Sequence, residues 1–413
     1  MKRFAAILLS LCLLAPLAGC GKTNTQGGKR PTELKTDVTV QPVSVTVPAD
    51  ATAAYDRFGV DLFKACYSGG NTLVSPLSVL GALGMTAGGA AGETLSQMES
   101  LFGMNADEVA AYLAAFGSDG EGAKLKIANS IWVREDLRVR DAFLARSTAN
   151  YGAAIYKTAF GDDTAAAINK WIEEHTDGLV KDVLDRVSPD AVMYLVNALA
   201  LDAKWEEIYK EYSVQKATFT AADGTKQDAE MMYSEESRYL ADADTTGFVK
   251  YYQGRRYAFA ALLPREGMSI ADYVASLDGE KLGALLDGVT AETVHAGLPR
   301  FKTEYSVEMS KALAALGMTD AFDPELADFS DMAEMEEDNN ICISRVLHKT
   351  YIAVDESGTQ AGAATVVEKT ECAMFEPEEP KEVILDRPFV YLLIDCENGN
   401  APVFIGTVES MSE

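Results

Sequence analysis

The three histidines of this 413-residue chain, His175, His295 and His348, are the side chains that could most readily support catalysis. A serine or cysteine nucleophile needs a histidine base within hydrogen-bonding reach. His175 falls in a surface-type helix pattern, His295 precedes a proline-bounded strand, and neither lies near a G-x-S-x-G motif. The sequence therefore indicates a protein that is not an enzyme.

The cysteines offer little further chemistry. They are scattered, and the sequence contains no CxxC or mixed Cys/His pattern of the kind that binds zinc. We expect no metal and no cofactor, and we expect most of these cysteines to be small buried hydrophobes rather than a disulfide framework. The six are Cys12, Cys20, Cys66, Cys342, Cys372 and Cys396.

The charge balance excludes one broad class of partner. The chain has 36 Lys and Arg against 63 Asp and Glu, a formal net charge of −27. Phosphate groups would be repelled, so we expect neither nucleic-acid binding nor adsorption to an anionic lipid surface through net charge. A solvated extracellular surface explains this charge, and basic loops on a partner could also use it.

The N-terminus has the pattern of an export signal. Lys2 and Arg3 precede an apolar run over residues 4–17, which is too short to be a membrane span. The run ends in Leu-Ala-Gly-Cys20, which resembles the bacterial lipoprotein signal. That resemblance implies removal of residues 1–19, a lipid on Cys20 as the sole membrane contact, and a place at the cell surface or in the periplasm. An ordinary signal peptide with a chance cysteine is the alternative.

Residues 20–49 are polar and rich in Thr, Gln, Gly and Pro, which predicts a flexible tether between the lipid and the folded part. A Val-Thr-Val alternation near its end could instead add an edge strand. Asp50 is a plausible N-cap for an amphipathic helix, and no second linker follows it. We therefore predict one domain over residues 50–413.

The stretch from Asp355 to Val367 is the most unusual in the chain. It mixes Gly and Ala, which are poor strand formers, with Thr and Val, which are good ones, and it has no charge after Glu356. This composition suits a segment that is mobile first and a strand later, although a small-residue linker would also fit. As a strand, one face would carry Thr359, Ala361, Ala363, Thr365 and Val367, and the other Gln360, Gly362, Ala364, Val366 and Glu368.

The segments on either side make the pattern specific. A strand-like run containing His348 precedes the stretch, and a Pro-Phe strand begins at Pro388. This order resembles the serpins, whose hinge reads Glu-x-Gly-Thr before an Ala-rich run. The resemblance extends over about Ala51 to Val408, through a small-residue helix at 76–90, a strand at 125–133, a helix at 168–178 and a long apolar strand at 192–205.

The resemblance implies an α+β serpin fold. Its large central sheet would be mostly antiparallel, with further sheets, about eight to nine helices and an exposed reactive-centre loop at about 356–387. It also assigns roles to residues. The hinge would be Glu356, Gly358, Thr359, Ala361, Gly362, Ala363 and Ala364. The shutter, a polar cluster that closes the two strands beside the gap, would be Ser75, Ser78, Asn197 and His348, with His348 hydrogen-bonded to Asn197. The breach, at the mouth of the gap, would contain Trp205. A core histidine satisfied by a backbone carbonyl remains the alternative for His348.

The function implied is suicide inhibition of an endopeptidase, by cleavage of the loop, trapping of the acyl-enzyme and insertion of the loop into the sheet. In the family the scissile residue lies about sixteen after the hinge Glu, which places the reactive bond at Cys372-Ala373, within a window from Glu371 to Met374. The partner would be an elastase-, chymotrypsin-, subtilisin- or papain-like protease rather than a trypsin-like one, and we expect a monomer. A non-inhibitory binding module or plain protease substrate is the alternative.

Three features depart from the family pattern. Gly362 replaces an Ala, Lys369 falls on the face that would be inserted, and the acidic arm from Ala373 to Arg387 is several residues longer than usual. Cys372 itself allows three interpretations: the bait residue, an exposed thiol open to oxidation or lipid modification, or a loop residue without a role.

Overall fold

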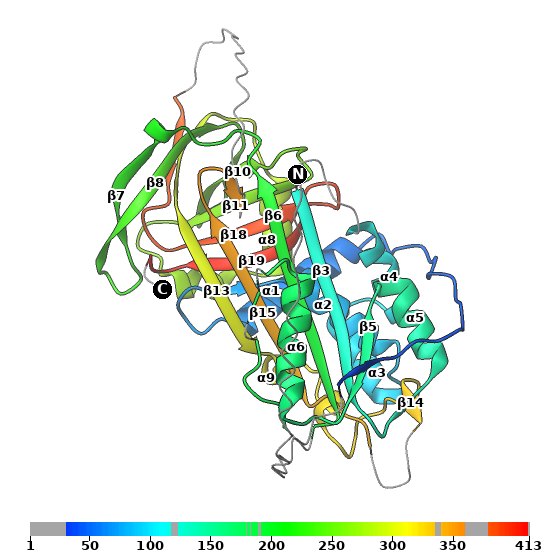
Figure 1. Ribbon diagram of the computed structural model, residues 1–413. Helices are drawn as coiled ribbons and strands as arrows, with labels where there is room; N and C mark the ends of the chain where they lie inside the picture. The colour runs from blue at the N-terminus through cyan, green and yellow to red at the C-terminus, as the bar shows by residue number, and fades with distance from the viewer. Residues whose placement is uncertain are drawn as a thin grey trace, which may run out of the picture.

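The main sheet contains the longest strands of the molecule. The computed structural model describes residues 30–116, 123–178, 180–181, 183–188, 191–334, 340–359 and 379–411. Across the sheet the strands follow the order β1 (Thr32–Glu33), β5 (Ala154–Thr158), β3 (Ala123–Arg134), β6 (Met193–Lys204), β16 (Gly358–Thr359), β15 (Arg345–Val354) and β13 (Phe301–Glu308). Figure 1 labels the five longer strands of this order. Antiparallel pairings predominate, with parallel contacts between β3 and β5 and between β6 and β15.

Strand β6 is covered on both faces, as its long apolar run predicts. On one face, α6 (Asp162–His175) lies across the sheet and packs Ile168 and Trp171 against Tyr194 and Val196 (Figure 1). On the other face, α2 (Pro76–Ala87) runs beneath the sheet, and each of its residues is buried. Small side chains allow this deep position, and the Ser75 hydroxyl caps α2 by accepting from the Ser78 N–H at 3.2 Å.

Two further sheets and a short strand pair make up the rest of the described β-structure. The second sheet has the order β2 (Leu73–Val74), β19 (Ala401–Val408), β18 (Phe389–Asp395), β11 (Tyr257–Pro264), β10 (Thr245–Tyr251) and β9 (Tyr239–Ala241). The third has the order β17 (Lys381–Ile384), β12 (Val294–Pro299), β8 (Lys226–Glu236) and β7 (Val214–Thr220). A short pair joins β14 (Ala333–Glu334) to β4 (Arg138–Val139).

The α+β class and the helix content are confirmed: the described part of the chain contains nine α-helices. Those not yet named are α1 (Ala51–Cys66), α3 (Gly92–Phe102), α4 (Ala106–Leu113), α5 (Asp141–Tyr151), α7 (Ile270–Ser276), α8 (Gly279–Asp287) and α9 (Ser310–Ala315). Short 3₁₀ turns occur at η1 (Ala114–Phe116), η2 (Glu211–Ser213) and η3 (Asp320–Phe322). Asp50 occupies the N-cap of α1 as predicted, but its side chain makes no capping hydrogen bond.

The segment before α1 differs from the predicted free tether. Thr32–Glu33 forms β1 on the outer edge of β5, and the Leu34 N–H donates to the Ile155 carbonyl at 2.8 Å. The open edge of β5 offers main-chain hydrogen bonds that an extended polar chain can satisfy. The edge strand thus forms well before the Val-Thr-Val alternation. No helix in the described residues is long and apolar enough to cross a membrane.

Candidate functional site: the seam between β6 and β15

The line between β6 and β15, which we call the seam, is closed at one end and occupied at the other. Direct parallel pairing runs from Arg345 opposite Tyr194 to Thr350 opposite Leu199. Beyond this, β16 lies between the two strands and pairs Thr359 with both Ala203 and Val354. The predicted hinge has therefore entered the sheet by two residues.

Gly358 is required at the point of entry. Its φ is +154°, a conformation that side chains rarely adopt. A Cβ at this position would lie 2.1 Å from the main-chain oxygen of Ala203 on β6. The glycine predicted for the hinge thus allows the backbone to approach β6 closely enough to begin a strand.

Main-chain hydrogen bonds fasten the chain just before β16. The Trp205 N–H donates to the Ser357 carbonyl at 3.0 Å, and the Tyr209 N–H donates to the Glu356 carbonyl at 2.9 Å. The Trp205 indole N–H donates to the Asp355 carbonyl at 2.8 Å. The predicted breach residue therefore binds the hinge through both its main chain and its ring.

Thr359 is buried, and its hydroxyl hydrogen-bonds with that of Tyr252. The Tyr252 ring stacks on the Trp205 ring with centroids 4.4 Å apart and planes 9° apart. Burial raises the pKa of Tyr252 far above its usual value, so the phenol stays protonated. We call Trp205, Tyr209 and Tyr252 the gate, because these three residues contact the inserted hinge.

The mouth of the gate carries exposed charges. The Arg300 guanidinium lies 2.6 Å from Glu356 and 2.7 Å from Glu230, joining the hinge to β8. The side chains of Arg300 and Glu356 are 40% and 42% exposed, so solvent screens this pair and its contribution is small.

At the closed end, the four predicted shutter residues lie together, but their bonds differ from the prediction. The His348 Nε2 accepts from the Ser75 N–H at 3.1 Å. The Asn197 amide donates to the Ser78 carbonyl at 2.6 Å and to the Asn129 Oδ1 at 2.5 Å, and its Oδ1 accepts from the Ser78 hydroxyl. The expected bond between His348 and Asn197 is thus replaced by bonds from each to neighbouring groups, because both point at the start of α2.

His348 is neutral in this setting. The ring is buried, and burial lowers the pKa of His348 from 6.5 to about 3. Its Nδ1 has no hydrogen-bond partner among the described residues. A neutral ring with one acceptor bond can close the seam but cannot act as a base near neutral pH. The other two histidines are remote, since His175 stacks on Trp171 of α6 and His295 lies exposed on β12.

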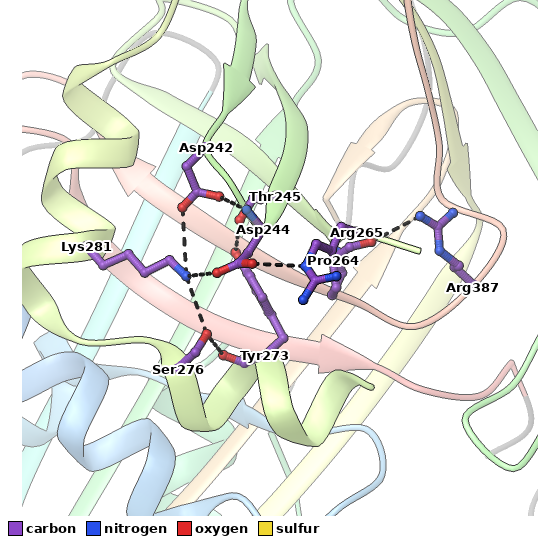
Figure 2. Close-up of polar contacts among 9 residues, drawn as sticks. All are labelled: Asp242, Asp244, Thr245, Pro264, Arg265, Tyr273, Ser276, Lys281 and Arg387. Carbon is purple, nitrogen blue, oxygen red and sulfur yellow. Dashed lines mark hydrogen bonds and ion pairs between the residues drawn. The ribbon is translucent and has the colours of Figure 1, made fainter. Parts of the chain in front are cut away.

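The far end of the loop is anchored on the other two sheets. After β17 pairs with β12, the Asp386 carbonyl accepts from the Thr220 N–H at 2.8 Å. The Arg387 guanidinium donates to the Pro264 carbonyl at the end of β11 at 3.0 Å (Figure 2). Beside it, Asp244 binds both Arg265 and Lys281 (Figure 2). Both ends of the loop are therefore held.

Several predicted residues lie outside the described part of the chain. The structure describes the loop up to Thr359 and again from Glu379. The predictions that fall outside it concern Cys20, Ala361, Gly362, Ala363, Ala364, Lys369, Glu371, Cys372, Ala373 and Met374. The described residues contain no group of three or more Asp, Glu, His or Cys side chains that could hold a metal.

Four residues that contact the seam were not predicted from the sequence: Tyr209, Tyr252, Arg300 and Asn129. Each comes from a segment remote from the hinge and contacts the seam only after folding. One signal was available: Tyr209 follows the predicted breach Trp by four residues. Asn129 lies in β3, Tyr252 directly follows β10 and Arg300 lies between β12 and β13, and nothing in these segments marks them as functional.

Comparison with known proteins decides the family. The model of the family described as Serpin (serine protease inhibitor) matches residues 53–411. The chain belongs to the serpin family. Serpins are generally protease inhibitors rather than catalysts.

Relatives span the whole domain. An uncharacterized serpin-like protein, TK1782, from Thermococcus kodakarensis is 30% identical over 364 residues, which are 86% of this chain and 84% of that protein. The leukocyte elastase inhibitor of Homo sapiens is 29% identical over 380 residues, covering 87% of this serpin and 98% of the inhibitor.

Solved serpin structures match in fold. The thermophilic serpin tengpin in its native state is 40% identical, with a TM-score of 0.86 over 92% of this chain and all of the other. The structure of tengpin in its latent state is 37% identical and has a TM-score of 0.77, covering 89% of this chain and all of the other. The arrangement of this serpin is thus nearer to the native than to the latent form.

Proposed function

We propose that this serpin inhibits an endopeptidase as a suicide substrate. The observation that carries the proposal is the docked hinge: two residues already form a strand at one end of a seam that is otherwise closed. A protease that cleaves the loop and forms an acyl-enzyme would free the hinge to continue into the seam. The leukocyte elastase inhibitors among its relatives support the same class of activity.

The energetics favour insertion. The six residue pairs that close the seam must separate, but a new strand between β6 and β15 gains hydrogen bonds along both of its edges. About a dozen inserted residues, at roughly 0.5–1.5 kcal/mol net per bond, would supply on the order of 10 kcal/mol before the cost of ordering the loop. At about 3.3 Å per residue, the bound protease would travel roughly 40–50 Å.

The class of protease that this serpin would inhibit depends on the residue before the reactive bond. We propose Cys372-Ala373 as the reactive bond, with Glu371 to Met374 as the window. A medium-sized apolar side chain fits the pocket of an elastase-, chymotrypsin-, subtilisin- or papain-like protease, whereas a trypsin-like pocket prefers Arg or Lys. A serine protease is the first candidate and a cysteine protease the second, and the inhibitor would act as a monomer.

We also propose where the protein acts. Export under the signal at residues 1–19 and a lipid on Cys20 would hold the inhibitor at the bacterial cell surface or in the periplasm. Mass spectrometry of the protein from membranes, before and after Cys20→Ser, tests this. Loss of a lipid-sized mass and of membrane association in the variant is expected, and an unmodified Cys20 in the wild type would refute the anchor.

A protease panel tests the inhibitory function. The domain is mixed with elastase-, chymotrypsin-, subtilisin- and papain-like enzymes and examined by denaturing electrophoresis and mass spectrometry. We expect an SDS-stable adduct and a C-terminal fragment that begins near Ala373. Cleavage without an adduct across the panel would show a plain substrate, and absence of both would favour a non-inhibitory binding module.

A further inference from the structure

A buried ammonium group lies directly behind the gate. Lys250, at the end of β10, has a side chain that is 3% exposed, and its Nζ lies 2.7 Å from the carboxylate of Glu236 on β8, which is 11% exposed. Removing an ammonium group from water is costly unless it is paired, so a lysine at this position needs compensating contacts. The pair also joins the second sheet to the third.

Two aromatic rings supply those contacts, and both belong to the gate. The Lys250 Nζ lies 4.5 Å from the centroid of the Tyr209 ring and 5.6 Å from that of Trp205. Both distances fall within the range of cation–π attraction, which is stronger when the cation is desolvated. The Ser234 hydroxyl donates to Glu236 at 2.6 Å and approaches the Tyr209 hydroxyl at 3.4 Å, which closes a ring of contacts.

Lys250 is protonated in this setting. Burial alone lowers the pKa of Lys250, but Tyr209 and Glu236 outweigh that effect and raise the pKa above its usual value. The ammonium is therefore present at any pH at which the protein would act, and it attracts both rings continuously.

Tyr209 lies outside the strands, so its side-chain contacts bear more on its position than those of Trp205 do. Trp205 is bridged to Tyr252, but Tyr209 lies in an irregular segment between β6 and η2, where no strand ladder fixes the backbone. The Tyr209 N–H nevertheless holds the Glu356 carbonyl of the hinge. Core packing and the contacts of its ring with Lys250 and Ser234 together place that N–H group.

We propose that Lys250 is a positioning residue for inhibition: its ammonium, paired with Glu236, holds Trp205 and Tyr209 where they dock the hinge. The inference rests on the proposed inhibitory function and specifies what controls its yield. After cleavage, insertion competes with hydrolysis of the acyl-enzyme. A docked hinge inserts faster because it extends an existing strand, whereas an undocked hinge must first pair with β6 and β15. Lys250 would thereby set the fraction of cleavage events that end in a trapped protease.

Two measurements test this. The first is the number of inhibitor molecules consumed per protease trapped. The second is hydrogen exchange at the Trp205 and Tyr209 amides, whose acceptors are hinge carbonyls and which therefore report docking without a protease. For Lys250→Met we expect both the consumption and the exchange rate of the Tyr209 amide to rise about fivefold, with the rate of loop cleavage unchanged.

Matched variants separate positioning from general destabilisation. Lys250→Arg keeps a cation beside the rings, so inhibitor consumption and Tyr209 amide exchange should both stay at their wild-type values. Glu236→Gln removes the counterion and should raise both. Tyr273→Phe is the control, because it removes a buried hydrogen bond of 2.8 Å to Thr245 at the opposite end of the same strand (Figure 2). It should lower the melting temperature and leave both readouts unchanged.

The outcomes are distinct. If the wild type traps no protease, the proposed function fails, and the exchange measurement alone then decides whether Lys250 positions the hinge. If the wild type traps protease but Lys250→Met leaves consumption and amide exchange unchanged, the positioning role is wrong. It is equally wrong if Tyr273→Phe shifts both readouts as far as Lys250→Met does.

Discussion

The two ends of the seam between β6 and β15 are built from different interactions. At the gate, main-chain amides and stacked rings hold the hinge, so this end is already open by two residues. At the shutter, buried side chains of Ser75, Ser78, Asn197 and His348 close the strands over α2. If the loop inserts as proposed, the seam would open from the gate towards the shutter, because the hinge already pairs with β6 and β15 at the gate while the shutter groups remain bonded.

The first prediction tests the gate and has the largest expected effect. Thr359→Arg places a cation where a buried hydroxyl now meets Tyr252. An unpaired buried charge costs several kcal/mol, so we expect trapping to fall on the order of 100-fold or more. Loop cleavage should continue at the wild-type rate. Electrophoresis should therefore show cleaved inhibitor and no adduct, and a persisting adduct would mean that insertion at this point is not required.

The second prediction tests the shutter. Asn197→Ala removes the partner of both the Ser78 carbonyl and the Asn129 side chain. Leaving such buried groups unpaired costs about 1–3 kcal/mol, so the free energy of unfolding of the intact protein should fall by that amount. Thermal or urea unfolding measures it. The gate should be unaffected, so an equal loss of protection at the Trp205 and Tyr209 amides would contradict the separation of the two ends.

The third prediction uses pH to distinguish the shutter from the rest of the core. The pKa of His348 is lowered to about 3, so on acidification the unfolded state binds the proton first. Stability should fall as pH decreases from about 6.5 towards 3, by up to about 1.4 kcal/mol per pH unit. Unfolding of His348→Gln, which keeps an acceptor for Ser75, should lose this acid dependence. If the free energy of unfolding of the variant falls with decreasing pH as steeply as that of the wild type, His348 is not the cause of this acid limb.

Asp56 on α1 provides a control of opposite sign. Burial, and then the carboxylate of Asp287, raise the pKa of Asp56 from 3.8 to about 7. Its contribution to stability is present at low pH and is lost as pH rises from about 4 through 7. This range overlaps the acid limb that we assign to His348, with the opposite sign, so Asp56→Asn should steepen the fall in stability between about pH 6.5 and 4, whereas His348→Gln should remove that fall.

The smallest expected effect is at the mouth of the gate. Glu356→Gln breaks the ion pair with Arg300, but both side chains are about two-fifths exposed. Such pairs contribute about 0–1 kcal/mol, so trapping should change less than about fivefold. The protease assay at two salt concentrations measures this. A loss as large as that of Thr359→Arg would show that the hinge is held by charge rather than by its buried residues.

The resemblance to the serpins located the seam, because the motifs that carry it are local. Gly358 and Thr359 lie within the serpin-like hinge, and the same resemblance assigned Asn197 and His348 to the two strands beside the gap. The bonds they make could not be predicted, because the start of α2 approaches both strands only in three dimensions. For the same reason Tyr209 and Lys250 escaped notice: their roles depend on contacts between separate sheets.

The edge strand β1 has a consequence for how the inhibitor would face its surroundings. It pairs with Tyr156 and Lys157, whose neighbours on β3 are Trp132 and Val133, whereas the opposite end of β3, at Ala123, pairs with Ala203 at the gate. About nine residues of strand, roughly 30 Å, separate the two places. With a lipid on Cys20, the twelve residues before Thr32 reach at most about 40 Å. A lipid on Cys20 would thus keep the β1 edge, at the end of β3 remote from the gate, within about 40 Å of the bilayer.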